Sequence, residues 1–420
     1  MTTGAAERLV IRGGAPLKGR VTVSGSKNAA LYALAAALLT AEPVVLRNVP
    51  EIADIGEMAE VLRDLGARVA IDGTTVSIEA CELTKTFADA ERVAALRASF
   101  LVMGPLLGRL GEAACPPPGG DVIGSRPLDV HFAGFRGLGA EVTREGPAYV
   151  ARSPKLKGAR IFFDYPSVLG TVNVIFAATL AEGVTTIINA AAEPEVEMAC
   201  DLLNAMGARV RNGGNNTVTV EGVAELHGAD FTVIPDRIEA GTYLLAGVAT
   251  GGDVEVVGAV PEHLDSLVAK FREMSVRVDP FEGGMRVRPD GPLQAVQMQA
   301  VPYPGFATDL HAPFAAALTQ AHGVSIIHER VYDNRMNYVA ELRLMGARLT
   351  NAGQSVMIEG PAPLVGTPVR AHDVRAGAAV VLAALCADGE TVIRDIGHID
   401  RGYADLDVRL RALGADVSRR

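Results

Sequence analysis

Apolar residues follow two alternating patterns along this chain, and both patterns recur. The first is an apolar stripe at helical spacing, as at Met58, Val61, Leu62 and Leu65, which predicts an amphipathic helix. The stripe ends in the phrase Leu65-Gly-Ala-Arg-Val69, where glycine is expected to stop the helix and a strand to begin. Copies of this phrase recur about every 70 residues. They begin at Leu65, Leu138, Met206, Met274, Met345 and Leu413.

The second pattern is an alanine-rich helix that is apolar on every side, followed by a break and a β-branched strand. A helix that is apolar all round must be buried all round. These helices are predicted at 29–40, 174–180, 240–249, 312–321 and 378–387, with strands starting at Val44, Val184, Val254, Val324 and Thr391. The two patterns together predict an α/β protein made of six similar modules that are grouped into a few domains.

Length and charge limit the class of protein. A chain of 420 residues suits two domains of about 200 residues each. Its net charge of −10 disfavours nucleic acid or an anionic membrane as partner, and an anionic small substrate would need a local cationic cluster. The longest apolar run, 29–39, is shorter than the ~20 residues that span a bilayer. Four scattered cysteines without a CxxC pair suggest a reducing compartment and no metal, so we expect a soluble cytoplasmic protein.

Residues 116–131 are the stretch of the chain that carries the most candidate chemistry. Their prolines and glycines exclude a regular helix or a central strand, which leaves a loop. The loop holds Asp121, Arg126, Asp129 and His131. Glycine-rich loops with ionisable groups often carry catalytic or binding residues, although a solvated surface turn is the alternative.

Two motifs resemble the enolpyruvyl transferase family. They are Ser24-Gly-Ser-Lys-Asn-Ala-Ala-Leu31 and Gly119-Gly-Asp-Val-Ile-Gly-Ser-Arg-Pro-Leu-Asp-Val-His131. Further matching motifs lie at 96–99, 235–242, 306–309, 333–335, 373–375 and 398–403. The similarity runs in one order from about residue 8 to residue 417.

The resemblance implies a fold of two inside-out α/β domains. Each domain would consist of three βαβαββ units around buried helices. One would span 27–234 and include the catalytic loop 116–131, and the other would combine 1–26 with 235–420. A substrate cleft between them would close on the ligand.

The resemblance also implies a reaction. The family moves the enolpyruvyl group of phosphoenolpyruvate onto a hydroxyl group and releases phosphate, by addition and then elimination, without a metal or organic cofactor. The motifs are most similar to the branch whose acceptor is the 3-hydroxyl of UDP-N-acetylglucosamine, in the first committed step of peptidoglycan synthesis. Three alternatives stay open: another uridine nucleotide, such as UMP at its 3′-hydroxyl in nucleoside-antibiotic assembly; the shikimate-pathway relative; and a non-catalytic UDP-sugar sensor.

Such a site needs cations for a phosphate and a carboxylate, together with an acid and a base. By resemblance Asp309 is the base, Asn28 contacts the sugar, and Arg335 positions the acceptor or the loop. The family's cationic set matches Lys27, Arg97, Arg126, Arg375 and Arg401, and the other implied binding residues are Pro127, Leu128, His131, Ser167 and Val168. Asp236 and Asp373 are expected to hold nearby cations. The alternative role for Asp309 is to cap the helix that follows Thr308.

The sequence departs from the family pattern at two places. Asp121 stands where most members carry the loop cysteine that fosfomycin alkylates, and Cys115 lies outside the motif. An ordinary carboxyl group ionises near pH 4 and a thiol near 8.5, so Asp121 must be desolvated or crowded by anions to donate a proton. Leu169 stands where the family usually has glycine, and Val130 replaces a common leucine. A one-residue shift of the glycine or a different nucleotide acceptor would explain the second departure.

Overall fold

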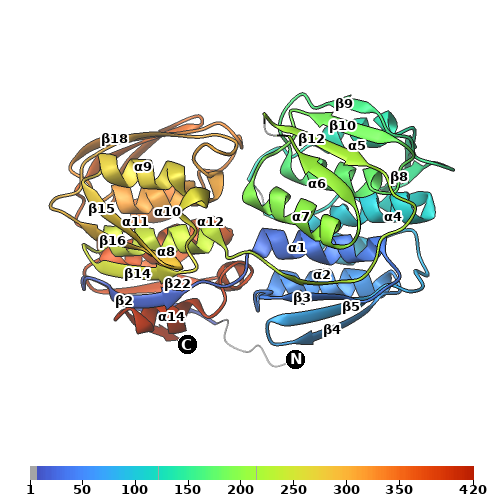
Figure 1. Ribbon diagram of the computed structural model, residues 1–420. Helices are drawn as coiled ribbons and strands as arrows, with labels where there is room; N and C mark the ends of the chain where they lie inside the picture. The colour runs from blue at the N-terminus through green and yellow to red at the C-terminus, as the bar shows by residue number, and fades with distance from the viewer. Residues whose placement is uncertain (1–6, 122, 214) are drawn as a thin grey trace. The chain divides into compact units, whose positions relative to one another are not determined.

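The computed structural model describes residues 7–121, 123–213 and 215–420 (Figure 1). Position 122 of the loop 116–131 and residues 1–6 of the predicted segment 1–26 therefore lie outside the described residues. The chain forms two compact units. Unit 1 comprises 1–24, 122–125 and 235–420, and unit 2 comprises 25–121 and 126–234.

Each unit contains three β-sheets; the four-stranded sheets are mixed and the three-stranded sheet is antiparallel. Unit 2 holds β13(Ala229–Thr232)-β3(Val44–Arg47)-β5(Thr75–Glu79)-β4(Arg68–Asp72), β11(Arg209–Asn212)-β12(Thr217–Glu221)-β10(Val184–Ile188)-β9(Arg160–Phe162) and β6(Glu112–Cys115)-β8(Ala148–Arg152)-β7(Glu141–Glu145). Unit 1 holds β21(Pro368–Arg370)-β22(Glu390–Arg394)-β1(Leu9–Arg12)-β23(Asp416–Arg419), β15(Val276–Phe281)-β16(Gly284–Pro289)-β14(Asp253–Val257)-β2(Lys18–Thr22) and β17(Gln297–Ala300)-β18(Gly323–Glu329)-β20(Ser355–Gly360)-β19(Arg348–Ala352).

Long-range strand pairing explains why the first residues belong with the last part of the chain. Strand β1 lies antiparallel between β22 and β23, and β2 runs parallel to β14. In unit 2, β13 runs parallel to β3 across about 185 residues of sequence, as in the pair Ala229 and Val44. Parallel neighbours need a crossover connection. The sheets that contain β1, β2 and β3 therefore join segments that are distant in sequence, whereas β9–β12 and β17–β20 each come from one stretch of the chain.

The repeated glycine phrase marks the end of a helix and the start of a strand in all six copies. The helices that it ends are α2(Ala53–Asp64), α5(Asp129–Gly137), α7(Pro194–Ala205), α9(Asp265–Glu273), α11(Tyr338–Leu344) and α14(Leu406–Ala412). The strands that follow are β4, β7, β11, β15, β19 and β23, one in each sheet. Gly66 has φ +107°, and Ser275, which replaces glycine in the fourth copy, still adopts φ +64°. The left-handed helix stop is therefore kept even without glycine.

The predicted alanine-rich helices are also confirmed. They are α1(Lys27–Ala36), α6(Val168–Ala178), α8(Arg237–Ala249), α10(Thr308–Leu318) and α12(Val374–Cys386), and almost every residue in them is buried. In unit 1, α8, α10 and α12 pack on one another inside the surrounding strands (Figure 1). In the remaining module, the second along the chain, α4(Met103–Leu110) takes the same role and packs against α6. Pattern analysis missed α4, which is only eight residues long and whose last turn is only partly buried.

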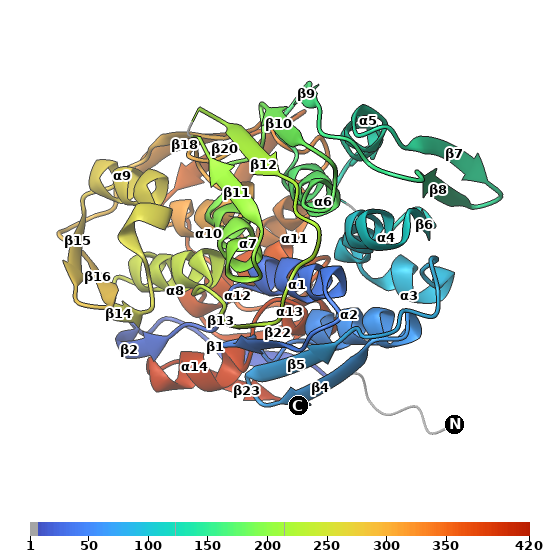
Figure 2. The same cartoon turned by 45° about the vertical axis from the view of Figure 1, so that its right-hand side comes forward.

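The amphipathic helices connect the buried helices to the sheets. In unit 2, α2 packs on α1 and β4, and α5 lies beside the hairpin β7–β8 (Figure 2). None of the helices in the described ranges is both long enough and apolar enough to cross a membrane. The fold is thus a mixed α/β fold. Some candidate residues, such as Lys27 and Asp309, lie at the starts of buried helices. Others, such as Arg126 and Arg401, lie outside these helices.

Candidate functional site

Three candidate residues of unit 1 meet at the starts of two buried helices. Asp309 lies in the first turn of α10, Arg375 in the first turn of α12, and Arg335 just before α11. Asp373 caps α12 by accepting from the backbone N–H groups of Arg375 and Ala376, both at 2.8 Å. The cap fixes the helix start and so aims the side chain of Arg375.

Asp309 forms an ion pair with both arginines. Its Oδ1 accepts from Nη2 of Arg335 at 2.6 Å, and its Oδ2 accepts from Nε and Nη2 of Arg375 at 3.1 and 2.9 Å. Burial raises the pKa of Asp309, but the guanidinium groups of Arg375 and Arg335 outweigh burial and hold that pKa well below its usual range. The carboxylate is therefore anionic in this arrangement.

Asp309 does not cap its helix. The N-cap of α10 is Ala307, which has no side-chain cap, and α10 begins at Thr308. The alternative role predicted for Asp309 is wrong, because its carboxylate is turned to the two guanidinium groups instead of the helix backbone.

Arg401 is followed by two residues that lie close to this cluster. It ends the short helix α13(Gly397–Asp400), and a Cβ atom on the following residue, Gly402, would meet Nη1 of Arg375 at 3.7 Å. Tyr403 receives a hydrogen bond from Nη1 of Arg375 at 3.2 Å. Gly402 and Tyr403, which follow Arg401, thus lie close to the guanidinium of Arg375.

In unit 2, Lys27 and Asn28 begin the buried helix α1, which Ser26 caps. Nζ of Lys27 lies 2.6 Å from Oδ2 of Asp54 in α2, and the two side chains expose only 10% and 3% of their surfaces. Asn28 is half-buried on the adjacent position. The lysine is therefore held as a fixed cation by a buried carboxylate.

The loop cations of unit 2 form a second group. Arg97 donates through Nη2 to the carbonyl oxygen of Arg126, and Arg126 donates through Nη2 to the carbonyl oxygen of Asp121 at 2.6 Å. Gly120 has φ +100°, and a Cβ there would lie 3.1 Å from Cβ of Arg97. A glycine is required where the loop passes this close to Arg97.

The loop tip packs on the Asp-Asn-Arg motif. Ser125 N–H donates to Oδ1 of Asp333 at 2.9 Å, and Asn334 N–H donates to the carbonyl oxygen of Ile123 at 3.3 Å. A Cβ on Gly124 would lie 1.7 Å from Oδ1 of Asp333. Both sides of these contacts belong to unit 1, which includes the loop tip at 122–125.

His131 is buried, with 2% of its surface exposed. Desolvation, with a further contribution from the charge of Arg97, lowers the pKa of His131 to about 3. Its Nδ1 lies 3.0 Å from Nδ2 of Asn173, which can only donate. His131 is thus a neutral imidazole that accepts at Nδ1. The predicted loop ends at Leu128: Asp129 begins α5, so the prediction that 116–131 contains no regular helix is wrong for 129–131, and His131 lies in the first turn of that helix. Of the other candidates, Pro127 is exposed and Leu128 is buried.

The departure at Leu169 has a packing explanation. Ser167 caps α6 by accepting from Gly170 N–H at 3.2 Å. Gly170 is buried, and a Cβ there would lie 2.8 Å from Cγ1 of Val130, whereas Val168 and Leu169 are only half-buried. The close approach thus occurs at position 170, which favours a one-residue shift of the family's glycine.

We expect Gly170→Ala to lower the free energy of unfolding by about 1–3 kcal/mol, since a methyl group has no room between Val130 and Ser167. Leu169→Ala should cost less, because that side chain is half-buried. Urea denaturation measures both variants. Adding Val130→Ala to Gly170→Ala should recover part of the loss; no recovery would contradict the contact with Val130.

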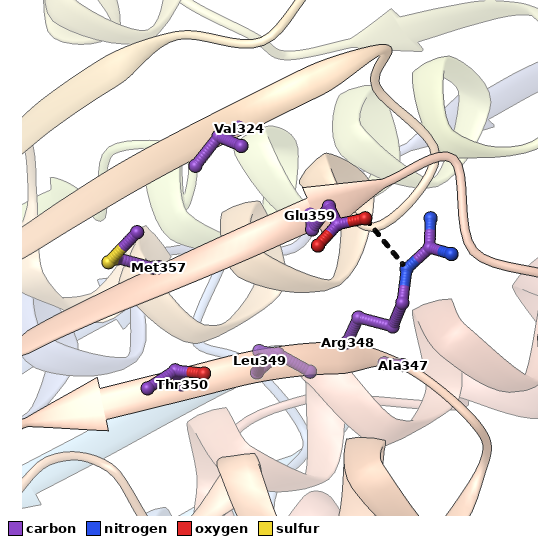
Figure 3. A pocket seen from close by; sticks show the side chains of 7 residues that line it. All are labelled: Val324, Ala347, Arg348, Leu349, Thr350, Met357 and Glu359. Atoms are coloured by element: carbon purple, nitrogen blue, oxygen red, sulfur yellow. Dashed lines mark ion pairs between the residues drawn. The ribbon is translucent and has the colours of Figure 1, made fainter.

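A hollow of about 220 Å³ lies on the β18–β20–β19 face of unit 1 (Figure 3). Its lining contains one ion pair, between Arg348 and Glu359 at 3.5 Å, and none of the candidate residues. Within the described ranges, no group of three or more His, Cys, Asp or Glu side chains is arranged to hold a metal ion. The candidate chemistry therefore belongs to the helix starts and the loop.

Sequence reasoning missed the partners of the predicted residues. Asp54 pairs with Lys27, Tyr165 donates to Oδ1 of Asp129 at 2.6 Å, and Asn173 holds His131. Thr308 accepts from Nη1 of Arg335 at 2.7 Å. Only an acid in the first turn of α2 and a polar residue inside the apolar helix α6 were visible as signals.

Comparison with known proteins identifies the family. The sequence profile of the EPSP synthase (3-phosphoshikimate 1-carboxyvinyltransferase) family matches residues 11–410. The chain belongs to this family of enolpyruvyl transferases, and the mixed α/β fold agrees with it.

Individual relatives are more specific. The chain is 47% identical to UDP-N-acetylglucosamine 1-carboxyvinyltransferase 3 of Caldanaerobacter subterraneus subsp. tengcongensis, over 98% of this chain and 99% of the relative. It is 46% identical to UDP-N-acetylglucosamine 1-carboxyvinyltransferase 1 of Staphylococcus aureus over the same shares. Among solved structures, the enolpyruvyl transferase NikO from Streptomyces tendae is 27% identical, with a TM-score of 0.88 and 99% coverage of both chains.

Proposed function

We propose that this protein transfers the enolpyruvyl group of phosphoenolpyruvate to the 3-hydroxyl of UDP-N-acetylglucosamine and releases phosphate. The observation that carries the proposal is the full-length identity of 44–47% to relatives named for this activity. In this role the protein would work in the cytoplasm at the first committed step of peptidoglycan synthesis, without a metal or organic cofactor.

The proposed chemistry assigns a step to each group. Asp309 takes the proton of the acceptor hydroxyl, whose oxygen attacks C2 of phosphoenolpyruvate, while an acid protonates the methylene carbon. Loss of a proton from the resulting methyl group then expels phosphate from the tetrahedral intermediate. We assign the proton donor to Asp121, because it replaces the family's loop cysteine and its backbone is fixed by Arg126.

Positive charge binds the two anionic groups of phosphoenolpyruvate in this scheme. The cations proposed for this role are Lys27, Arg97, Arg126, Arg375 and Arg401. The planar fork of arginine suits carboxylate and phosphate oxygens. The remaining residues proposed to bind the acceptor are Asn28, Pro127, Leu128, His131, Ser167, Val168 and Arg335. Because His131 is neutral and buried, we assign it a structural role beside the site instead of proton transfer.

We also propose that 27–234 and the combination of 1–26 with 235–420 act as two functional domains, each built of three βαβαββ repeats around buried helices. Three sheets in each unit and one glycine phrase in each sheet support this organisation.

A second candidate acceptor is another uridine nucleotide, such as UMP. The observation behind this alternative is the half-buried side chain of Leu169, which stands where the resemblance leads us to expect glycine. Phosphate release should be measured with phosphoenolpyruvate and UDP-N-acetylglucosamine, UMP or shikimate 3-phosphate. Release only with the first supports the proposal; release only with another acceptor replaces it, and no release with any acceptor leaves a UDP-sugar sensor.

We expect the enzyme to resist fosfomycin, because position 121 offers a carboxylate in place of the thiol. Cys115 cannot substitute, since it is buried in β6 and burial raises the pKa of its thiol. Asp121→Cys should make the enzyme lose activity over time in the presence of fosfomycin, whereas Asp121→Ser should not. The phosphate-release activity that remains after incubation measures this loss. Inactivation of the unmodified enzyme would contradict this prediction.

A further inference from the structure

The two oxygens of the Asp309 carboxylate are both occupied by arginine. Oδ1 is bound to Arg335 and Oδ2 to Arg375. Each guanidinium side chain is only 6% exposed, whereas the Asp309 side chain keeps 26% of its surface open to solvent. A ligand can therefore reach the carboxylate of Asp309, but the negative charge of this carboxylate is already paired with the two guanidinium groups.

This arrangement conflicts with the role of a base. The efficiency of a general base rises as its pKa approaches the operating pH. Two guanidinium groups hold the pKa of Asp309 far below that range. Asp309 can gain basicity only if one arginine withdraws from it.

The two arginines are held by very different supports. Nη1 of Arg335 donates to Oγ1 of Thr308 at 2.7 Å, and the Thr308 hydroxyl lies 2.7 Å from Oε2 of Glu329. A guanidinium can only donate and a carboxylate can only accept, so the hydroxyl proton must point to Glu329. Glu329 is fully buried, and its Oε1 accepts from Val331 N–H at 2.7 Å.

A buried histidine and tyrosine stand behind Glu329. Nδ1 of His311 lies 3.0 Å from Oε2 of Glu329, and the Tyr338 hydroxyl lies 2.8 Å from Nε2 of His311. Burial lowers the pKa of His311, so the ring is neutral; it donates at Nδ1 and accepts at Nε2. Burial raises the pKa of Glu329, but hydrogen bonds from His311 and Thr308 outweigh burial and lower it overall. A directed chain of hydrogen bonds therefore anchors Arg335.

Apart from Asp309, Arg375 is held by neutral groups. Among the described residues, its ion-pair partner is Asp309, and its other polar side-chain contact is the neutral hydroxyl of Tyr403, whose ring lies 5.5 Å from the guanidinium carbon. Tyr403 in turn lies 3.0 Å from Oγ1 of Thr242, which donates to the carbonyl oxygen of Ile238 at 2.8 Å, so this chain ends on a neutral carbonyl and not on a buried carboxylate. An incoming carboxylate or phosphate could replace Asp309 as the partner of Arg375 without breaking a second ion pair.

We propose that Arg375 is exchanged from Asp309 to the incoming substrate anion, which frees Oδ2 to act as base, while Glu329 is a positioning residue that keeps Arg335 on Oδ1 through Thr308. The identity of the anion as phosphoenolpyruvate rests on the proposed function. The exchange makes proton removal from the acceptor depend on the presence of the second substrate.

Competition for Arg375 is tested by binding and not by turnover. If Asp309 competes with the anion, the isosteric neutral variant Asp309→Asn should bind phosphoenolpyruvate at least about tenfold more tightly than the wild type, a change of about 1.4 kcal/mol. Isothermal titration calorimetry without acceptor measures this, with inorganic phosphate as a second probe.

Asp236→Asn is the matched control. Asp236 caps α8 and adds to the negative potential at Arg375 without contacting its guanidinium. Its neutralisation should tighten binding much less than Asp309→Asn. Equal effects of the two variants, unchanged or weaker binding by Asp309→Asn, or no binding to either form would overturn the exchange.

The positioning role of Glu329 is tested at Thr308. Thr308→Val removes the hydroxyl that links Arg335 to Glu329 and should lower kcat by up to about 100-fold, as misplaced catalytic groups do. Thr308→Ser restores the hydroxyl and should restore kcat. Valine leaves polar atoms of Arg335 and Glu329 without this partner and should lower the melting temperature, so kcat is compared at a temperature where all three forms are folded. Full kcat in Thr308→Val, or failure of serine to rescue it, would overturn the role.

The two hypotheses fail separately. If the wild type releases no phosphate with any acceptor but Asp309→Asn binds phosphoenolpyruvate more tightly, the exchange stands and the proposed function fails. If phosphate release occurs but binding does not tighten, the function stands and the exchange fails.

Discussion

Asp309→Asn should lower kcat for phosphate release by about 10²–10⁴-fold, which is the range expected when a general base is removed. Asparagine keeps the shape of the side chain and can still accept from one arginine, so the fold should survive. In the proposed scheme the reaction loses only the carboxylate that takes the acceptor proton. Steady-state phosphate release with phosphoenolpyruvate and UDP-N-acetylglucosamine measures the effect.

The control for this variant is its stability. Asp309 is ion-paired to two buried guanidinium groups, so neutralising it could also loosen the helix starts of α10 and α12. Thermal denaturation of the variant separates a local loss of chemistry from a general loss of structure. A folded Asp309→Asn enzyme with a kcat within threefold of the wild type would exclude Asp309 as the base.

Helix ends and buried helices could be predicted well from the sequence, because local chemistry specifies them. The phrase Leu65-Gly-Ala-Arg-Val69 and its copies place a left-handed residue after each amphipathic helix, and the structure has that residue even where Ser275 replaces glycine. All-apolar helices such as α12 leave no exposed face. The exception, α4, combines a buried start with an exposed end, and its pattern is too weak to stand out.

The sheets could not be predicted in the same way. Strand β1 pairs with β22 and β23, nearly 400 residues away, and nothing in its four residues specifies that partner. Strand register and neighbours follow from the burial of whole faces, which is a property of the assembled unit. Pattern therefore predicted the elements, while the sheet order came from the structure.

The candidate site shows the same limit. Motifs singled out Asp309, Arg335 and Arg375, but not that these three side chains pair with one another. They also singled out Lys27 without its partner Asp54. Glu329 reads in sequence as the last residue of a strand, and only the structure shows it buried behind Thr308. Buried charges require partners, yet the spacing of residues does not tell which acid will serve a given cation.

Lys27→Met should have two separable effects, one on stability and one on activity. The variant leaves the Asp54 carboxylate, 3% exposed, without its ion-pair partner. Breaking a buried pair by removing one partner costs about 3–5 kcal/mol of folding free energy. The same change removes a cation proposed to bind phosphoenolpyruvate, and kcat/KM should fall by about 100-fold or more, since hydrogen bonds to charged groups contribute about 1.5–3 kcal/mol each.

Adding Asp54→Asn to Lys27→Met distinguishes the two effects. The neutral amide no longer carries an unpaired charge, so most of the lost stability should return in urea denaturation. Activity should not return, because the substrate anion still lacks its ammonium partner. If the double variant regains both stability and kcat/KM, Lys27 serves the fold alone; if it regains neither, the pair with Asp54 is not what stabilises the start of α1.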